Sequence, residues 1–341
     1  MPRLPAEWEP QAGVIVTWPH SGTDWSSHLE EVERLYHQLS TRILAHEPLL
    51  VVARDEAHRA HILSLLPSST RHPLHTSLAE TNDTWIRDYG PITVIDEGRP
   101  RELDFTFNAW GGKYPCQRDD RVTRSLVENG LFTNADYRRI DLVLEGGAIE
   151  TDGRGTLLAT ERSLVDPSRN PGLDRSELEA RLRPLLGVDR FLWLENGQLS
   201  GDDTDGHIDT LVRFVAPDAL CHLQCDDRSH PDHSALSHLE EELKALRQAD
   251  GSPYRLIPLP HPSPIRDKEG RLLPASYANF LIINGAVLLP VYGDPADRAA
   301  AAVLRRCFPG RRIVPLDCHV LITQKGALHC ATMQLPACVH L

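Results

Sequence analysis

The sequence predicts an α/β fold made of repeated strand–strand–helix–strand units around a common axis. Polar or charged side chains open apolar, strand-like runs five times, at intervals of 51 to 72 residues. Turn residues close four of these runs into hairpins, and a helical segment follows each hairpin. A recurrence of this size is typical of repeated supersecondary units. We therefore expect the polar openings, which lie at equivalent ends of the units, to converge on one pocket.

The N-terminal part is predicted to contain two buried strands and two helices. Residues 12–19 and 49–52 are expected to form the strands. Between them, apolar residues recur every three or four positions, which predicts a helix whose buried stripe comprises Leu29, Val32, Leu35, Tyr36, Leu39 and Ile43. Ser26 or Ser27 is expected to cap this helix. Residues 55–66 are expected to form the second helix.

Four hairpins are predicted where apolar runs flank turn residues. Their first strands are expected within residues 84–95, 142–150, 206–214 and 277–283. The turns fall at residues 96–98, 152–153, 216–218 and 284–285. Asp-Gly and Asn-Gly between apolar runs are strong hairpin signals. The first hairpin is expected to continue into residues 102–107. A fifth polar opening, Cys330, stands at the start of a short C-terminal strand, after a loop that contains Gly326.

Helices are expected after these hairpins, near residues 119–130, 176–186, 233–248 and 295–307. Asp119 and Asp120 open the first of them, where acidic side chains suit the positive end of the helix dipole. Further strands, such as residues 191–194 and 312–316, follow the helices. No low-complexity linker divides the chain, so we expect a single domain over residues 1–341.

Composition limits the classes of partner. The 341 residues include 36 basic and 48 acidic side chains, a net charge of −12, which disfavours nucleic acid and anionic membranes and favours a cationic substrate. No apolar run approaches the ~20 residues of a membrane span. The N-terminus has no apolar signal-peptide core, so a cytoplasmic protein is expected. The seven cysteines are irregularly spaced, and we expect reduced thiols.

The polar openings suggest nucleophilic catalysis by a thiol. They are Asp88, Glu145, His207 with Asp209, Asn279 and Cys330. A thiol needs a nearby base or positive group to ionise near neutral pH, and His207 is the preferred partner of Cys330. Because consecutive strand residues point to opposite faces, His329 is expected to face away from Cys330 and to be structural. His207 and Asp209, two residues apart, are expected to share one strand face.

The carboxylates of Asp88, Glu145 and Asp209 would make this pocket strongly acidic, and such a pocket should bind a cation. A planar guanidinium matches carboxylates well because it offers several donors in one plane. The predicted chemistry is attack of a thiolate on a guanidinium carbon. The glycine- and aromatic-rich segment 108–114 is either a loop that approaches the ligand or a plain surface turn.

A metal site is not expected. The ligand-type residues Cys221, Cys225, His230 and His233 are too closely spaced for a zinc finger, whose pairs lie about 12 or more residues apart. His72 and His75 flank Pro73, which disfavours a helix that would carry both on one face.

Several segments resemble one enzyme family. Residues 82–91 are similar to the N-D-x-W-x-R-D-x-G-P motif of the agmatine deiminases, and six further segments match that family in order: residues 4–10, 107–112, 144–147, 206–209, 277–295 and 329–330. The resemblance implies the pentein fold, a five-bladed α/β propeller of ββαβ units with pseudo-fivefold symmetry. It also implies a cofactor-free guanidine hydrolase that forms a covalent amidino-cysteine intermediate.

The same resemblance implies roles for individual residues. Cys330 would be the nucleophile, His207 the general acid/base, and Asp88 and Asp209 the guanidinium clamp. Glu145 would support His207 or contact the substrate. Residues expected to line the substrate pocket are Trp85, Trp110 and Asn279. This chain departs from the family in the loop 324–328, where Gly-Gly-Gly is common, and in a shorter segment after Gly112.

The leading functional hypothesis is hydrolysis of agmatine to N-carbamoylputrescine and ammonia. Peptidyl-arginine or another guanidine compound is the alternative substrate. A papain-like cysteine hydrolase and a non-catalytic pentein that only binds ligands are the rival classes. The expected partner is a small cationic guanidine, and a homo-oligomer is possible. Arginine's carboxylate finds no basic partner in these motifs except Arg87, which is expected to face away from Asp88 and to be structural.

Overall fold

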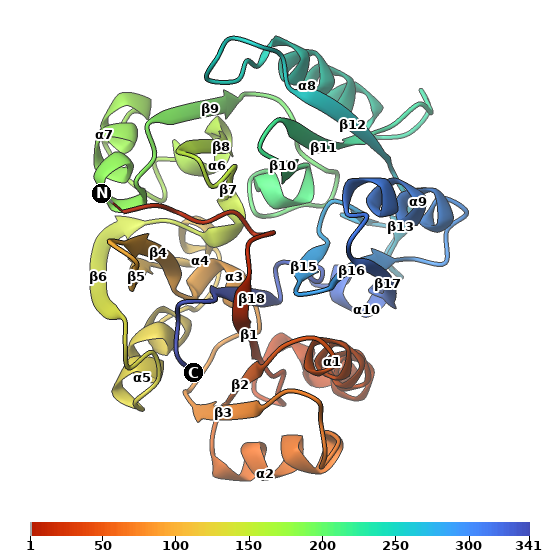
Figure 1. Ribbon diagram of the computed structural model, residues 1–341. Helices are drawn as coiled ribbons and strands as arrows, with labels where there is room; N and C mark the ends of the chain where they lie inside the picture. Colours follow the sequence, from red (N-terminus) through yellow and green to blue (C-terminus); the bar gives the residue numbers. More distant parts are fainter. Residues whose placement is uncertain (1) are drawn as a thin grey trace.

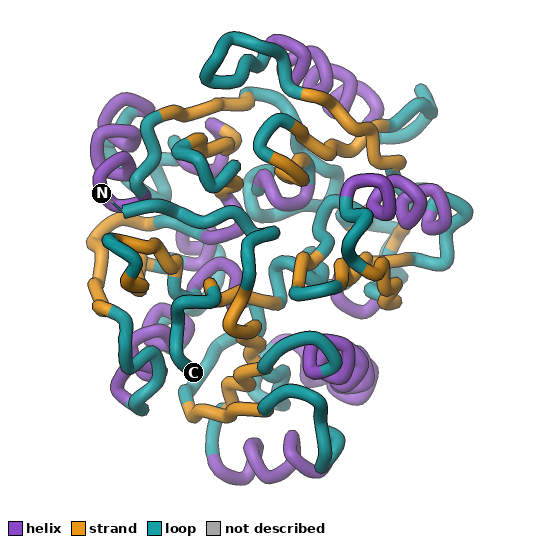
Figure 2. Tube along the Cα trace, in the orientation of Figure 1, coloured by secondary structure: helices purple, strands orange, loops and turns teal. Residues whose placement is uncertain are grey.

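The computed structural model describes residues 2–341, in which five α/β units surround a central axis (Figure 1). Four units share one connection: an antiparallel hairpin, a helix, and a strand parallel to the hairpin's second strand. Strands lie toward the middle of the ring and the longer helices lie at its periphery (Figure 2). The predicted α/β fold of repeated ββαβ units is confirmed.

The helices α5, α7, α8 and α9 of these four units begin and end within a few residues of the predicted bounds. In chain order, the units are β4 (Ile92–Asp96), β5 (Arg99–Thr106), α5 (Val122–Glu128) and β6 (Asp136–Val143); β7 (Ile149–Thr151), β8 (Thr156–Thr160), α7 (Arg175–Leu186) and β9 (Arg190–Leu194); β10 (Val212–Ala216), β11 (Ala219–Gln224), α8 (His233–Ala245) and β12 (Arg255–Pro260); β15 (Leu281–Ile283), β16 (Ala286–Val291), α9 (Asp297–Cys307) and β17 (Arg312–Asp317).

The fifth unit joins the two ends of the chain. β18 (Thr332–Pro336) pairs antiparallel with β1 (Gln11–Thr17), with Val14 opposite Gln334. Helix α1 (Leu29–Leu44) then leads to β2 (Leu49–Ala53), and α2 (Glu56–Leu65) leads to β3 (Leu74–Leu78), both parallel to the preceding strand. The strand after Cys330 is therefore fixed to the N-terminal part of the chain.

Shorter elements complete the ring. They are the helices α4 (Ala109–Gly112), α6 (Glu161–Leu164) and α10 (His319–Ile322), and the two-stranded sheet of β13 (Ile265–Arg266) and β14 (Leu272–Leu273). None of the helices in the described part of the chain combines the length and the apolar character that crossing a bilayer requires.

Helix α1 has the predicted buried stripe but not the predicted cap. Its residues Val32, Leu35, Tyr36, Leu39 and Ile43 are buried, and Leu29 packs at the edge. Ser26 and Ser27 lie inside a preceding 3₁₀ turn, Asp24–His28, whose N-cap is Thr23. The cap prediction was wrong because the chain enters α1 through this extra turn.

Asp119 and Asp120 open the helical segment, as predicted, in a 3₁₀ turn (Asp119–Arg121) that runs into α5, and their carboxylates are also tertiary anchors. Asp119 accepts hydrogen bonds from the backbone N–H groups of Asn82 and Asp83, at 2.7 and 3.2 Å. Asp120 accepts the Phe107 N–H at 2.6 Å. The two carboxylates therefore hold in place the segments that lead into the central pocket.

The polar openings do not lie on strands. Asp88 lies in the helical turn α3 (Ile86–Tyr89), Glu145 and His207 precede the 3₁₀ turns Gly146–Ala148 and Ile208–Thr210, and the residues before β18 also form a turn. The strand starts expected near residues 84, 206 and 277 were wrong, and residues 142–150 span the end of β6 and the start of β7. At the crowded centre, tight turns give the backbone N–H and C=O groups local hydrogen-bond partners in place of a neighbouring strand.

Candidate active site

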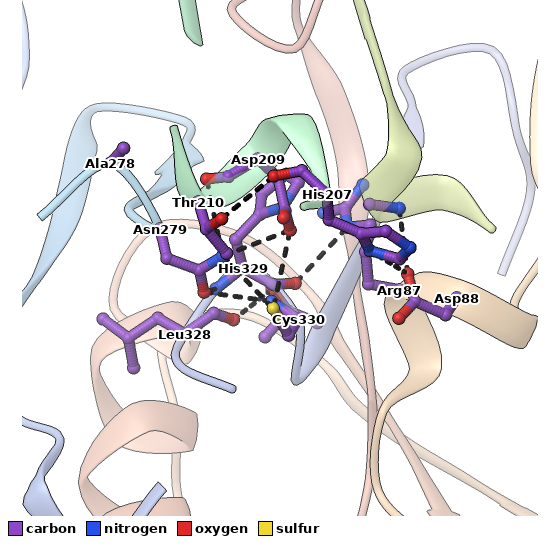
Figure 3. A network of polar contacts seen from close by, with 12 residues as sticks. Arg87, Asp88, His207, Asp209, Thr210, Ala278, Asn279, Leu328, His329 and Cys330 are labelled. Carbon is purple, nitrogen blue, oxygen red and sulfur yellow. Dashed lines mark hydrogen bonds and ion pairs between the residues drawn. The ribbon is translucent and has the colours of Figure 1, made fainter. Parts of the chain in front are cut away.

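Turns of the units meet at the centre of the ring. Figure 3 shows Cys330 beside Asp209, Asn279 and His329, with His207 and Asp88 nearby. The six polar residues predicted for the site, Asp88, Glu145, His207, Asp209, Asn279 and Cys330, are all buried. A cavity of about 190 Å³ opens beside Cys330 and is bordered by Trp85, Asp88, Trp110 and Tyr114. The structure thus brings the predicted residues together although it places them on turns.

The thiol of Cys330 has polar but not basic neighbours. Its Sγ lies 3.2 Å from Nδ2 of Asn279 and 3.5 Å from Oδ2 of Asp209. Burial raises the pKa of the Cys330 thiol well above its usual value, and the carboxylates of Asp209 and Asp88 add to this increase. These contacts do not include His207, so its role as the partner of Cys330 stays a prediction. A positive charge brought by the substrate would favour the thiolate instead.

His207 is held by Glu145 and keeps one nitrogen free. Its Nε2 lies 2.9 Å from Oε2 of Glu145, whereas Nδ1 has no hydrogen-bond partner among the described residues and lies 3.7 Å from Oδ1 of Asp88. Burial lowers the pKa of His207, but the surrounding carboxylates of Asp88, Glu145 and Asp209 outweigh it and raise the pKa to about 9. At neutral pH His207 is an imidazolium with an uncommitted N–H.

Glu145 is in turn paired with Arg169, a residue that the sequence analysis missed. The Arg169 Nε atom donates to both carboxylate oxygens, at 2.9 and 2.8 Å, and only 1% of its side chain is exposed. Arg169 also contacts Asp205 at 2.9 Å and the carbonyl oxygen of Thr204 at 3.1 Å. No periodicity or motif marks Arg169, which lies in a loop between α6 and α7.

Asp88 is oriented by two donors. Its Oδ1 accepts the Gly147 N–H at 2.9 Å, and its Oδ2 accepts Nε1–H of Trp110 at 2.9 Å. Burial and the neighbouring carboxylates raise the pKa of Asp88 to about 6, although His207 acts in the opposite direction. Trp110 adopts a left-handed backbone conformation with φ of 55°. Segment 108–114 is therefore a wall of the site rather than a plain surface turn.

Asp209 has one oxygen occupied and one free. Its Oδ2 accepts hydrogen bonds from Nδ1 of His329 at 2.8 Å and from Nδ2 of Asn279 at 3.1 Å, whereas its buried Oδ1 has no partner. Burial raises the pKa of Asp209, but His329, His207 and Arg213 outweigh it, so the pKa is lowered. This carboxylate is anionic at neutral pH.

His329 contacts Asp209, which the sequence analysis did not foresee. It was expected to be structural because it would alternate with Cys330 on a strand, but residues 328–331 form a turn. Its other nitrogen, Nε2, lies 2.7 Å from Oε1 of Glu7. Arg87 also lies on that side, where its Nε donates to the His329 carbonyl at 3.3 Å, so Arg87 does face away from the pocket as expected.

The rim of the cavity carries charges of both signs. Nζ of Lys325 and the hydroxyl of Tyr114 each lie 2.7 Å from Oδ2 of Asp203. Asp24 and Asp83 border the same cavity. Burial raises the pKa of Asp83 to about 6, and the charge of Asp24 contributes to this increase. The loop 324–328, which differs from the family pattern, thus places Lys325 at the mouth of the cavity.

Ligand-type side chains also gather outside the cavity. His230, Asp232 and His261 form one group, in which Nε2 of His261 lies 2.9 Å from Oδ2 of Asp232. The Asp232 N–H donates to Nδ1 of His230 at 3.1 Å, so this group forms hydrogen bonds within itself. His233, which the sequence analysis weighed with Cys225, bonds instead to the Cys225 carbonyl.

Comparisons with known proteins agree with this geometry. A family model described as Porphyromonas-type peptidyl-arginine deiminase matches residues 3–336. The agmatine deiminase of Stutzerimonas stutzeri (strain A1501) is 36% identical over 358 residues, which cover 98% of this chain and 95% of that protein. The agmatine deiminase of Pseudomonas aeruginosa (strain UCBPP-PA14) is 35% identical, with the same coverage.

Solved structures are similar over the whole chain. A Porphyromonas gingivalis protein provisionally named an arginine deiminase has 46% identity and a TM-score of 0.94, and the match covers 100% of both chains. A C. jejuni agmatine deiminase with substrate bound has 33% identity and a TM-score of 0.91, and covers 98% of this chain and 96% of its own.

Proposed function

This chain belongs to the Porphyromonas-type peptidyl-arginine deiminase family, and from that premise we propose that it hydrolyses agmatine to N-carbamoylputrescine and ammonia. The enzyme class is a hydrolase that acts on the C–N bonds of linear amidines. Agmatine joins a guanidinium to a short aliphatic chain that ends in an ammonium. Both ends of this molecule are cationic, as the acidic cavity requires.

One observation carries the proposal. Two buried polar atoms beside Cys330 have no hydrogen-bond partner: the Oδ1 acceptor of Asp209 and the Nδ1 donor of His207. An unmade hydrogen bond in a buried site costs about 1–3 kcal/mol, so a substrate that forms hydrogen bonds with both atoms would be stabilised there. A guanidinium N–H would satisfy Oδ1 of Asp209, and Asp88 would bind it from the other side.

The first half of the reaction follows from these charges. The bound guanidinium offsets the carboxylates that disfavour the thiolate, so Cys330 releases its proton to solvent water and its thiolate attacks the guanidinium carbon. The tetrahedral adduct then expels one nitrogen. His207 donates its Nδ1 proton to that nitrogen, which leaves as ammonia, and an amidino group remains on the sulfur.

The second half uses His207 in the opposite sense. Neutral His207 takes a proton from a water molecule, which attacks the amidino carbon. As the carbon–sulfur bond breaks, the hydroxyl proton of the adduct passes to the sulfur, so the product leaves with a new carbonyl oxygen and the Cys330 thiol is restored. Glu145 and Arg169 keep His207 oriented through both halves.

The mouth of the cavity favours a substrate tail that ends in a cation. Asp83 and Asp24 border it, and Asp83 forms no ion pair with any residue that the structure describes. The aromatic rings of Trp85 and Trp110 line the path of an aliphatic chain. A distal ammonium would be attracted to these carboxylates.

An arginine derivative is the second candidate substrate. Lys325 borders the cavity, and its ammonium could pair with a carboxylate that agmatine lacks. In this structure, however, Lys325 is already paired with Asp203, which is why we place agmatine first.

Ammonia release from agmatine, free arginine and a capped arginine peptide tests the proposal directly. We expect turnover of agmatine with the highest kcat/KM. Absence of ammonia from all three compounds would refute the deiminase activity, and a preference for the peptide would change the substrate but keep the chemistry.

A further inference from the structure

The N-terminal segment runs to the middle of the ring, where it borders a second hollow together with Arg87, Gly146 and Gln334. It precedes β1 and crosses the ring toward β18 (Figure 1). There Glu7 lies among polar groups from β10 and from the segment around β18. Its Oε2 is 2.5 Å from Nη2 of Arg213 and 3.0 Å from Nε2 of Gln334, and its Oε1 is 2.7 Å from Nε2 of His329. About 20% of the Glu7 side chain is exposed.

His329 links Glu7 to the site. Its two ring nitrogens lie 2.7 Å from Oε1 of Glu7 and 2.8 Å from Oδ2 of Asp209, and its side chain is 1% exposed. Two carboxylate acceptors require an N–H on each nitrogen of the ring. Glu7, His329 and Asp209 thus form a line of three hydrogen-bonded side chains, which runs from the N-terminal segment to the substrate clamp.

This line determines which oxygen of Asp209 is available. His329 and Asn279 both donate to Oδ2, and Oδ1 is left without a partner. Asn279 is fixed as well, because its Oδ1 accepts the backbone N–H groups of His329 and Cys330 at 3.0 and 3.3 Å. The carboxylate of Asp209 therefore has a defined rotamer and a defined free oxygen.

We propose that Glu7 and His329 are positioning residues, which hold Asp209 anionic and turned so that its free oxygen receives the substrate's guanidinium. The inference rests on the proposed function for the identity of the guanidinium, but it concerns the clamp rather than turnover. Docking of the N-terminal segment thereby becomes part of the active site, although the segment contacts no substrate.

Other charged groups face this line from every side and also affect how its protonation changes with pH. Arg87 and Arg213 face Glu7, Glu150 pairs with Arg213, and His207 and Asp88 face Asp209 from the cavity side. Since the hydrogen bond from His329 is the largest of the effects that lower the pKa of Asp209, its replacement should change the protonation of Asp209 most.

The test compares two alkylating reagents of the same shape and different charge. 2-Chloroacetamidine carries a cationic amidinium, and 2-chloroacetamide is its neutral counterpart; both alkylate the sulfur and release chloride. The ratio of their rates at Cys330, followed by mass spectrometry of the peptide, measures the anionic clamp without requiring hydrolysis. Each ratio is measured from pH 4 to 9 on the full chain.

The variants separate the links of the line. H329Q retains a donor at about the position of Nε2 and loses the one to Asp209, H329N does the reverse, and E7Q removes only a charge. We expect the amidine-to-amide ratio to fall at least tenfold in H329Q and severalfold in E7Q. The decrease of this ratio toward acid pH should begin at a higher pH in H329Q and E7Q than in the wild type. H329N should stay closer to the wild type.

E9Q is the matched control, because it makes the same chemical change in the same segment, where Glu9 pairs with Arg3 instead. It should retain the wild-type ratio and pH limb. A merely structural role would slow both reagents equally and leave the ratio unchanged. Unchanged ratios and acid limbs in H329Q and E7Q would overturn the inference, and if H329Q did not fold, E7Q against E9Q would decide alone. A wild type that favours the amidine but does not consume agmatine would refute the proposed function and leave this inference standing.

Discussion

Nδ1 of His207 lies 3.7 Å from Oδ1 of Asp88 and forms no hydrogen bond, although both side chains are buried. The gap is too long for a direct hydrogen bond. Each group changes the pKa of the other: Asp88 raises that of His207, and His207 lowers that of Asp88. The pair therefore sets the pH range in which a proton donor and an anionic clamp coexist.

The first prediction is a bell-shaped pH profile of kcat/KM for agmatine. His207 has a pKa raised to about 9 and is a proton donor only below that pH, so activity should fall on the alkaline side. Asp88 has a pKa raised to about 6 and is anionic only above that pH, so activity should also fall on the acid side. Steady-state ammonia release across pH 4 to 11 measures both limbs.

Replacement of Glu145 should move the alkaline limb more than the acid limb. E145Q retains a hydrogen-bond acceptor for His207 but removes a carboxylate that raises the pKa of His207 through both its hydrogen bond and its charge. The charge of Glu145 also raises the pKa of Asp88, so both limbs should shift to lower pH, and the alkaline limb should shift further. An alkaline limb that stays in place would contradict this role of Glu145.

The second prediction concerns the clamp. D88N and D209N keep the shape of each side chain and remove its charge. A charge-assisted hydrogen bond contributes about 1.5–3 kcal/mol, so kcat/KM should fall at least tenfold in each variant. The D218N variant, in an exposed hairpin turn, is the control and should behave like the wild type. Near-normal kinetics in both clamp variants would mean that the guanidinium binds elsewhere.

The third prediction concerns the substrate tail. We expect kcat/KM for agmatine to exceed that for free arginine at least hundredfold, or about 2.7 kcal/mol, because acidic groups border the mouth. K325A should lower any residual arginine activity further, since it removes the cation nearest to a substrate carboxylate. Comparable efficiency on agmatine and arginine in the wild type would contradict this reading of the rim.

The fourth prediction tests the packing of that rim. A Cβ at Gly326 would lie 2.3 Å from Cζ3 of Trp85, which real contacts do not allow. G326A should therefore displace Trp85, raise KM for agmatine and lower the melting temperature. G310A is a suitable control, because a Cβ at Gly310 would meet no neighbouring atom. Normal KM and stability in G326A would show that the position of Trp85 matters neither for substrate binding nor for stability.

The sequence predicted the repeated units and the residues that converge, because hairpin turns and apolar periodicity are local properties of the chain. It did not predict the turns that carry Asp88, His207 and Asp209, since their conformation depends on crowding at the axis. Gly147 illustrates this: a Cβ there would lie 2.7 Å from Nδ1 of His207. Local propensity contains no information on such a close approach.

Contacts between residues far apart in the sequence also could not be predicted. Glu7 and His329 are 322 residues apart in sequence, and Arg169 meets Glu145 across a loop without any motif. The alternation rule gave His329 the wrong conformation, because a turn replaces the expected strand before β18. Such contacts follow from closure of the ring, which pairs β1 with β18.

Covalent catalysis by Cys330 is the central claim, and mass spectrometry of enzyme quenched during turnover tests it most directly. With agmatine, the wild-type chain should gain the mass of agmatine less ammonia, and peptide mapping should place that gain on Cys330. C330A should remain folded, show no adduct and release no ammonia. Turnover of agmatine by C330A, or an adduct on any other residue during productive turnover, would contradict the account.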